Sequence, residues 1–253
     1  MAEDTRPAVA IVQTRMTSSR LPGKVMKPLA GAPLIRRMIE RVLRIGGLDR
    51  VVVALAEGMA NDPVIAALDG MDVTIVRGSE ADVLSRYADA ARATGATTVM
   101  RVTSDCPLLD PEVSAMVLTA YTDARQSGIR YARTSPEFGY PHGFDTEVFD
   151  ADALYEAEAN ATERFDREHV TPYIRTRPDR FPAVTIDTKP DRRNWRLTVD
   201  TEQDYQLASA IYDALYPRNP DFTYADIVSL FESRPELRAA AEGASAIARA
   251  AAR

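Results

Sequence analysis

The residues best suited to chemistry lie in one short basic stretch near the start of the chain. From Gln13 to Lys24 the sequence reads QTRMTSSRLPGK, which combines two arginines, a lysine and several hydroxyl side chains. A triphosphate needs many hydrogen-bond donors around it, and these side chains together with loop N–H groups would supply them. Arginine forks match phosphate oxygens, whereas lysine acts as a mobile point charge. The stretch therefore predicts a phosphate-binding loop, and a merely solvated basic loop is the alternative.

This loop is not a Walker A motif. The pattern GxxxxGK[ST] is absent, because Val25 follows Lys24 and Gly23 is the one glycine of the stretch. The donors that we expect to contact the nucleotide are Gln13, Arg15, Ser18, Ser19, Arg20 and Lys24.

The elements around this loop favour an α/β fold. Short apolar runs at residues 9–12, 51–55, 73–76 and 98–102 alternate with helical patterns at 34–45, 62–68, 82–93 and 111–125. This rhythm predicts a mostly parallel, doubly wound (Rossmann-like) sheet with helices on both faces. Ligands of such sheets bind at the carboxyl ends of the strands, which is where the basic loop and Asp105 would lie.

After about residue 128 the rhythm breaks. Residues 131–149 indicate a loop or hairpin, 153–171 a helix, 183–186 and 195–199 strands, and 201–215 and 224–232 helices. We expect one domain over residues 1–238, with a smaller mixed α/β or hairpin extension at about 128–182. An Ala-rich terminal helix or tail, loosely packed, would occupy residues 239–253.

Composition narrows the class of protein. The net charge of −6 over 253 residues argues against a nucleic-acid binder, yet residues 15–27 hold four basic side chains and no acid, which favours a small anionic ligand. No apolar run approaches the length of a membrane span, and the N-terminus does not resemble a secretory signal. The single cysteine, Cys106, excludes an internal disulfide and suits a cytoplasmic protein.

Five segments, in order along the chain, carry a family resemblance. They are RMTSSRLPGK at 15–24, GSEADVLSRY at 78–87, RVTSDCPLLDP at 101–111, REHVTPYI at 167–174 and WRLTVDT at 195–201. These segments resemble motifs of the cytidylyltransferases that activate sugar acids, which include the CMP-KDO and CMP-sialate synthetases. The branch named for spore coat polysaccharide biosynthesis protein F is the most similar. The resemblance spans about residues 9–232.

The resemblance implies an activity and a set of roles. CMP would pass from CTP to a small anionic acceptor (a sugar acid, phosphonate or phosphate), and pyrophosphate would leave. Asp105 and Asp200 would bind Mg²⁺, and Arg15 and Lys24 would hold the triphosphate, which makes these four the expected catalytic residues. The implied nucleotide contacts also include Gly78, Asp82 and Ser104, and the implied acceptor contacts are Tyr140, His142, Asp145, Arg167 and His169.

Two further features follow from the resemblance. It suggests a homodimer, with residues 128–182 as the acceptor or dimerisation extension. It also exposes a departure, because Thr17 stands where the family usually has glycine. A β-branched residue disfavours positive φ, so we expect the loop to bend differently here.

Structural alternatives exist for several of these residues. Asp105 could be a plain turn residue and Asp200 a helix N-cap. Asp82 and Arg86, four residues apart on one helix, could form a surface ion pair. The aromatic residues that could line an acceptor pocket are more often core, namely Tyr131, Tyr140, Phe144 and Trp195.

Two other functions compete with the cytidylyltransferase. A glycosyltransferase that uses a nucleotide sugar would have a similar sheet, but it would usually carry an Asp-x-Asp pair where this chain has Thr103-Ser104-Asp105. A non-catalytic nucleotide-binding module would be favoured by loss of Lys24 or Asp105, and both are present.

Overall fold

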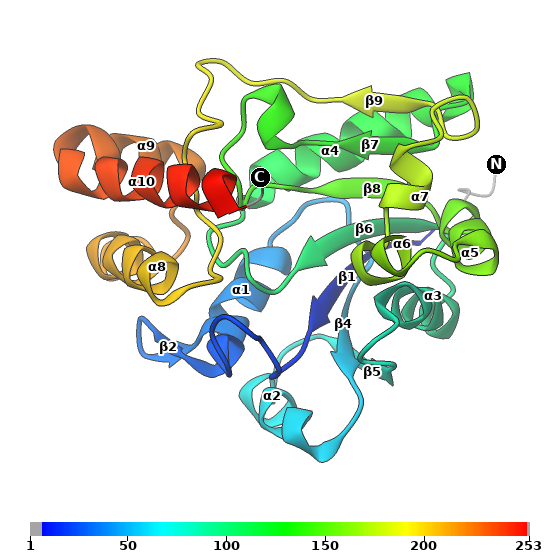
Figure 1. Ribbon diagram of the computed structural model, residues 1–253, viewed down its shortest axis with the longest axis horizontal. Coiled ribbons are helices and arrows are strands. Elements are labelled where there is room, and N and C mark those ends of the chain that lie inside the picture. The colour runs from blue at the N-terminus through cyan, green and yellow to red at the C-terminus, as the bar shows by residue number, and fades with distance from the viewer. Residues whose placement is uncertain (1–6, 252–253) are drawn as a thin grey trace.

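A seven-stranded sheet forms the centre of the computed structural model, which describes residues 7–251 (Figure 1). The strand order is β5-β4-β1-β6-β8-β7-β9. The strands are β1 (Ala8–Thr14), β4 (Arg50–Ala56), β5 (Thr74–Gly78), β6 (Thr98–Thr103), β7 (Tyr131–Arg133), β8 (Glu147–Asp150) and β9 (Ala183–Thr185). The first six and last two residues, which belong to the predicted domain and tail, lie outside the described part of the chain.

The first half of the chain confirms the predicted parallel sheet. Strands β1, β4, β5 and β6 are mutually parallel, with β1 between β4 and β6. Their residues are mostly apolar because helices cover both faces of the sheet. The connecting helices are α1 (Leu34–Val42), α2 (Asp62–Ala67) and α3 (Val83–Thr94), and α4 (Pro111–Ala124) follows β6. A small hairpin, β2 (Pro28–Leu29) with β3 (Ala32–Pro33), precedes α1.

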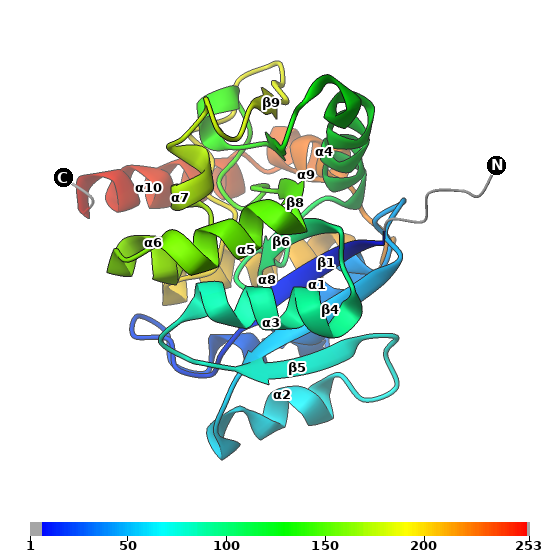
Figure 2. The same cartoon turned by 90° about the vertical axis from the view of Figure 1, so that its right-hand side faces the viewer.

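Two helical layers enclose the sheet, one on each face (Figure 2). Helices α1, α2 and α4 pack on one face through side chains such as Ile35, Val64 and Val117. Helices α3 and α5 (Ala151–Asn160) pack on the other through side chains such as Leu84 and Leu154. Within the described residues, no helix is both long and apolar enough to span a bilayer.

The second half adds antiparallel strands to the same sheet. Strand β8 pairs antiparallel with both β6 and β7, which confirms the hairpin predicted within residues 131–149. The single helix predicted over 153–171 is instead two helices, α5 and α6 (Arg164–His169), followed by α7 (Pro172–Arg175). The break follows Asn160, where the Arg167 guanidinium donates to the carbonyl oxygens of Glu158 and Ala161 and thereby satisfies the open end of α5.

The strand predicted at residues 195–199 is wrong. This segment forms no strand of the sheet, because its backbone bonds to loops and a helix instead. Leu197 N donates to His142 O at 2.7 Å, and Val199 N donates to Asp105 O at 2.7 Å. The segment therefore lies across the carboxyl edge of the sheet and ends at Asp200.

Three C-terminal helices form a third apolar cluster. They are α8 (Glu202–Leu215), α9 (Tyr224–Ser233) and α10 (Pro235–Ala251). Leu237 and Ala241 of α10 are buried in this cluster, so the Ala-rich helix is packed rather than loose. Phe144 and Trp195 are buried there too, which makes these aromatic residues core and not pocket lining.

A close backbone contact holds the 195–200 segment in place. Gly143 has a φ of +110°, and a Cβ at this position would lie 2.7 Å from the carbonyl carbon of Leu197. Only glycine permits both the backbone conformation and this approach.

We therefore expect Gly143→Ala to destabilise the fold by more than about 2 kcal/mol, because it combines positive-φ strain with a backbone clash. Gly128→Ala is the matched control, since Gly128 has a φ of +89° and a Cβ added there would meet no atom within 4 Å. Urea denaturation of both variants would measure the difference, and equal losses would show that the contact with Leu197 is unimportant.

Candidate active site

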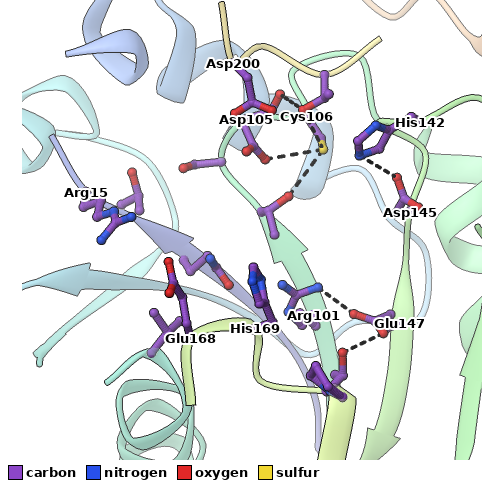
Figure 3. A pocket seen from close by; sticks show the side chains of 18 of the residues that line it. Arg15, Arg101, Asp105, Cys106, His142, Asp145, Glu147, Glu168, His169 and Asp200 are labelled. Atoms are coloured by element: carbon purple, nitrogen blue, oxygen red, sulfur yellow. Dashed lines mark hydrogen bonds and ion pairs between the residues drawn. The ribbon is translucent and has the colours of Figure 1, made fainter. Parts of the chain in front are cut away.

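A cavity of about 530 Å³ opens at the carboxyl edge of the parallel strands (Figure 3). Most residues that the sequence marked as site residues line it, including Asp105 and Asp200. The predicted residues that line the cavity are Gln13, Arg15, Ser18, Ser19, Arg20, Lys24, Ser104, Asp105, His142, Asp145, His169 and Asp200. They come from segments far apart in the chain that meet because parallel strands end at the same edge.

The basic loop bends at Gly23 rather than at the unusual threonine. Gly23 has a φ of +68°, and its N–H donates to Met16 O at 3.0 Å. Among the described residues other than glycine, positive φ occurs at Ala30 and Val170, so Thr17 is not strained. Its hydroxyl instead donates to Glu80. The loop then enters a short 3₁₀ helix, Lys24–Met26, which carries Lys24 into the cavity.

Lys24 joins the two predicted metal carboxylates. Its ammonium lies 3.2 Å from Asp105 Oδ2 and 2.8 Å from Asp200 Oδ1, and it also donates to Val199 O at 2.8 Å. The Lys24 and Asp200 side chains are each 11% exposed, so this contact is shielded from water. The two carboxylates therefore converge on the Lys24 ammonium, although only Asp105 follows a strand of the sheet. Their role as Mg²⁺ ligands stays a prediction.

Burial and charge act in opposite directions on this group. Burial alone would lower the pKa of Lys24, but the carboxylates of Asp105 and Asp200 raise it above its usual value. Burial would raise the pKa of Asp105, yet the Lys24 ammonium and the Thr103 hydroxyl hold it below the usual range. Lys24 and Asp105 are therefore both charged at neutral pH.

Arg196 orients the Asp200 carboxylate by binding the oxygen that does not contact Lys24. Its Nη2 donates to Asp200 Oδ2 at 2.6 Å, and its Nε donates to Asp204 Oδ1 at 3.1 Å. Thr201, not Asp200, is the N-cap of α8, and it forms a capping box with Asp204. Asp200 is thus free of the capping role and presents Oδ1 to Lys24 and Arg20.

Asp105 is likewise no helix cap. Asp110 caps α4 by accepting from the backbone N–H of Glu112 and Val113. Asp105 lies in the turn after β6, with its carboxylate directed at the loop lysine.

Four predicted site residues do not line the cavity, namely Gly78, Asp82, Tyr140 and Arg167. Tyr140 is buried in the C-terminal cluster. Asp82 accepts from Ser85 N as the N-cap of α3 and is paired with Arg167. The surface ion pair between Asp82 and Arg86 is wrong, because Arg86 is buried and donates to Ser79 O at 2.7 Å.

The two histidines lie on different sides of the cavity. His142 Nδ1 is 2.9 Å from Arg196 Nη1, and its Nε2 is 4.0 Å from Asp145. Burial raises the pKa of Asp145, although His142 and the backbone N–H of Gly143 act in the opposite direction. His169 projects from α6 with its ring 4.5 Å from that of Phe165.

Several lining residues were missed by the sequence reasoning. Arg101, Glu147, Arg133 and Arg175 all line the cavity. Arg101 had a recognisable signal, because it is the one charged residue within the buried run of β6. The others occupy short strands and a short helix whose pairing only the folded chain reveals.

The two carboxylates suit Mg²⁺, which also takes ligands from substrate and water, better than they suit a metal ion that needs protein ligands alone. Among the described residues, no group of three or more His, Cys, Asp and Glu side chains could hold a metal ion. Mg²⁺ is usually held by one or two carboxylates, with substrate phosphates and water completing its shell. Asp105 and Asp200, which already share one cation, fit that requirement.

A doubly wound sheet that places a basic loop opposite two convergent carboxylates defines the chain as a nucleotidyltransferase. Comparison with known proteins specifies the family. The family model described as cytidylyltransferase matches residues 9–230, and the chain belongs to this family.

Known relatives agree with this assignment. The chain is 31% identical to spore coat polysaccharide biosynthesis protein SpsF of Bacillus subtilis, over 89% of this chain and 94% of that protein. A cytidylyltransferase structure from Leptospira borgpetersenii is 26% identical with a TM-score of 0.86, and the match covers 91% and 95% of the two chains. CMP:2-keto-3-deoxy-manno-octonic acid synthetase, solved with CTP, shares the fold at 16% identity with a TM-score of 0.62, covering 83% and 100%.

The bridging position of Lys24 gives a testable consequence for metal binding. In the nucleotide-free protein its ammonium would compete with any metal ion that binds Asp105 and Asp200. Lys24→Met removes the ammonium between the two carboxylates. Asp105 then loses its ion-pair partner beside Asp200, although Asp200 keeps Arg20 and Arg196, and the two carboxylates repel each other more strongly. We expect this variant to bind Mn²⁺, as a spectroscopic substitute for Mg²⁺, at least about tenfold more tightly than the wild type, or about 1.4 kcal/mol.

Electron paramagnetic resonance titration of free Mn²⁺ would measure this change. Lys27→Met is the control, because Lys27 pairs with the more exposed Glu202 outside the carboxylate pair. An unchanged or weaker Mn²⁺ affinity in a folded Lys24→Met protein would contradict this arrangement.

Proposed function

We propose that the protein transfers CMP from CTP to a small anionic acceptor, with Mg²⁺ as cofactor and pyrophosphate as the second product. The observation that carries the proposal is the contact of one loop lysine with both Asp105 and Asp200. It brings the phosphate-binding loop and the metal carboxylates to the same point. Among the cavity-lining residues, arginine and lysine also outnumber aspartate and glutamate, although the whole chain has a net charge of −6.

The basic loop would bind the triphosphate. Arg15 and Arg20 are 42% and 62% exposed; Arg15 is paired with the half-exposed Glu80, and Arg20 with the shielded Asp200. The exposed pair of Arg15 contributes little free energy, and Asp200 keeps Arg196 as a partner, so a triphosphate could replace the carboxylates at both arginines. Lys24 would exchange its carboxylate partners for phosphate oxygens, which accept hydrogen bonds equally well.

Catalysis would consist of positioning and charge neutralisation. The acceptor oxygen attacks the α-phosphorus of CTP, and the bond to the pyrophosphate oxygen breaks. Arg15 and Lys24 neutralise the pyrophosphate as it leaves. Bound at Asp105 and Asp200, Mg²⁺ would supply charge neutralisation and lower the pKa of the attacking oxygen. Asp145, whose pKa is raised, could take the proton of an acceptor hydroxyl.

Two features support CTP as the donor. The chain belongs to the cytidylyltransferase family, and a structure with the same fold was solved in complex with CTP. Within residues 7–251, the side-chain oxygens of Gln13 and Thr14 have no hydrogen-bond partner and are buried in the cavity wall, where a ligand would supply donors. The homodimer suggested by the family resemblance remains a prediction for sedimentation to test.

Release of pyrophosphate with a panel of sugar acids, phosphates and phosphonates would test the function. We expect turnover with CTP to exceed turnover with ATP, GTP or UTP. Asp200→Asn should lower kcat by roughly 10²–10³, the usual loss for one group that stabilises transition-state charge. Glu202→Gln, next to the helix start and exposed, serves as the control.

Equal turnover with all four nucleotides would refute the cytidylyl assignment. Hydrolysis of nucleotide sugars without pyrophosphate release would instead favour a glycosyltransferase.

A further inference from the structure

A row of charged side chains crosses three neighbouring strands on the far side of the cavity from the basic loop. Arg101 on β6 lies opposite Glu147 on β8, and Glu147 lies opposite Arg133 on β7. Residues opposite each other on adjacent strands point to the same face of a sheet, so the three side chains lie in one row. All three line the cavity. Strand β1, which leads into the basic loop, lies on the other side of β6.

Glu147 is fully occupied by neighbours within this row. It accepts from Arg101 Nη1 at 2.6 Å, from Thr171 Oγ1 at 2.8 Å and from the Tyr131 hydroxyl. Burial alone would raise the pKa of Glu147, but Arg101 and the hydroxyl donors hold it below its usual value. Glu147 is therefore ionised and dedicated to Arg101, as the contacts in Figure 3 show. Arg133 forms its ion pair with Glu137 instead.

Two arginines at this end of the cavity lack a shielded counter-charge. Arg133 donates to Glu137, whose side chain is 67% exposed, and such a solvent-exposed partner neutralises charge weakly. Arg175, at the end of α7, is exposed and forms no side-chain hydrogen bond or ion pair within residues 7–251. The Nε of Arg101, which lines the same cavity, is buried without a partner among those residues.

A neutral hydrogen-bonding group, the His169 ring, also lines the cavity. His169 lines it from α6, and burial together with the charges of Arg101 and Arg175 holds its pKa below the usual value. The ring is therefore mostly neutral at pH 7 and adds hydrogen-bonding capacity rather than charge.

We propose that Arg133 and Arg175 form a second oxyanion site, which binds an anionic group of the acceptor while another oxygen of the acceptor reaches Asp105 and Asp200. The inference rests on the proposed function. Arginine forks suit carboxylate, phosphate and phosphonate oxygens alike, so the shared chemistry is a planar or tetrahedral oxyanion. The acceptor thus carries an anionic group in addition to its reacting oxygen, and the two ends of the cavity set their relative positions.

Inorganic phosphate is a suitable probe when the basic loop is already filled. The protein is first saturated with Mg²⁺ and the α,β-methylene analogue of CTP, which cannot react at the α-phosphorus. Phosphate is then titrated and its binding followed by calorimetry. We expect the wild type to bind phosphate beside the nucleotide, Arg133→Gln and Arg175→Gln each to bind it roughly tenfold more weakly, and the double variant to show no binding.

The controls separate this site from the nucleotide site. Arg218→Gln removes an exposed arginine that does not line the cavity and should bind phosphate as the wild type does. The Arg133 and Arg175 variants should keep their nucleotide affinity within about twofold. Absence of phosphate binding by the nucleotide-loaded wild type, or equal binding by all variants, would overturn the proposal.

Two further experiments identify the preferred anion and separate failure of this proposal from failure of the proposed function. Acetate is titrated in the same way as phosphate. Tighter binding of acetate would indicate a carboxylate site, and tighter binding of phosphate would indicate a phosphate or phosphonate site. If the nucleotide analogue fails to bind, the proposed function fails. The same comparison then runs in nucleotide-free Arg15→Gln protein, where phosphate binding that still depends on Arg133 and Arg175 would establish the second site independently.

Discussion

The architecture depends on one ammonium group held between two carboxylates. Lys24 comes from the loop after β1, Asp105 from the turn after β6, and Asp200 from the residue before the capping box of α8. Charges this well shielded are tolerated only when they are paired and hydrogen-bonded. The contact therefore ties the start, the middle and the C-terminal part of the chain to one point at the sheet edge.

Other features of the site keep Lys24, Asp105 and Asp200 in contact. Arg196 orients Asp200 from behind and links it to Asp204 and His142. The glycine at 143 lets the backbone of the 195–200 segment approach closely enough to do so. On the opposite side, antiparallel β8 and β7 widen the sheet beyond β6 and carry Glu147 and Arg133 into the wall of the cavity. Under the proposed function, a nucleotide and its acceptor would bind at separate ends of this one cavity.

The sequence predicted the parts of this structure that depend on local pattern. The strands β1, β4, β5 and β6, the basic loop and Asp105 follow from apolar periodicity and from the rule that ligands bind at strand ends. The 195–199 segment was misread as a strand because its apolar composition matches one, whereas its hydrogen bonds go to distant loops. The Arg101–Glu147–Arg133 row escaped prediction because it exists only through the register of antiparallel strands.

We infer that the loop lysine and the two carboxylates form a single nucleotide-and-metal site. A crystal structure of the protein with Mg²⁺ and an unreactive CTP analogue would test this most directly. We expect a triphosphate contacted by Arg15 and Lys24 and a metal ion ligated by Asp105 and Asp200, with Lys24 displaced from the carboxylates. A nucleotide bound elsewhere, or an intact Lys24–Asp200 contact with the nucleotide in the cavity, would contradict it.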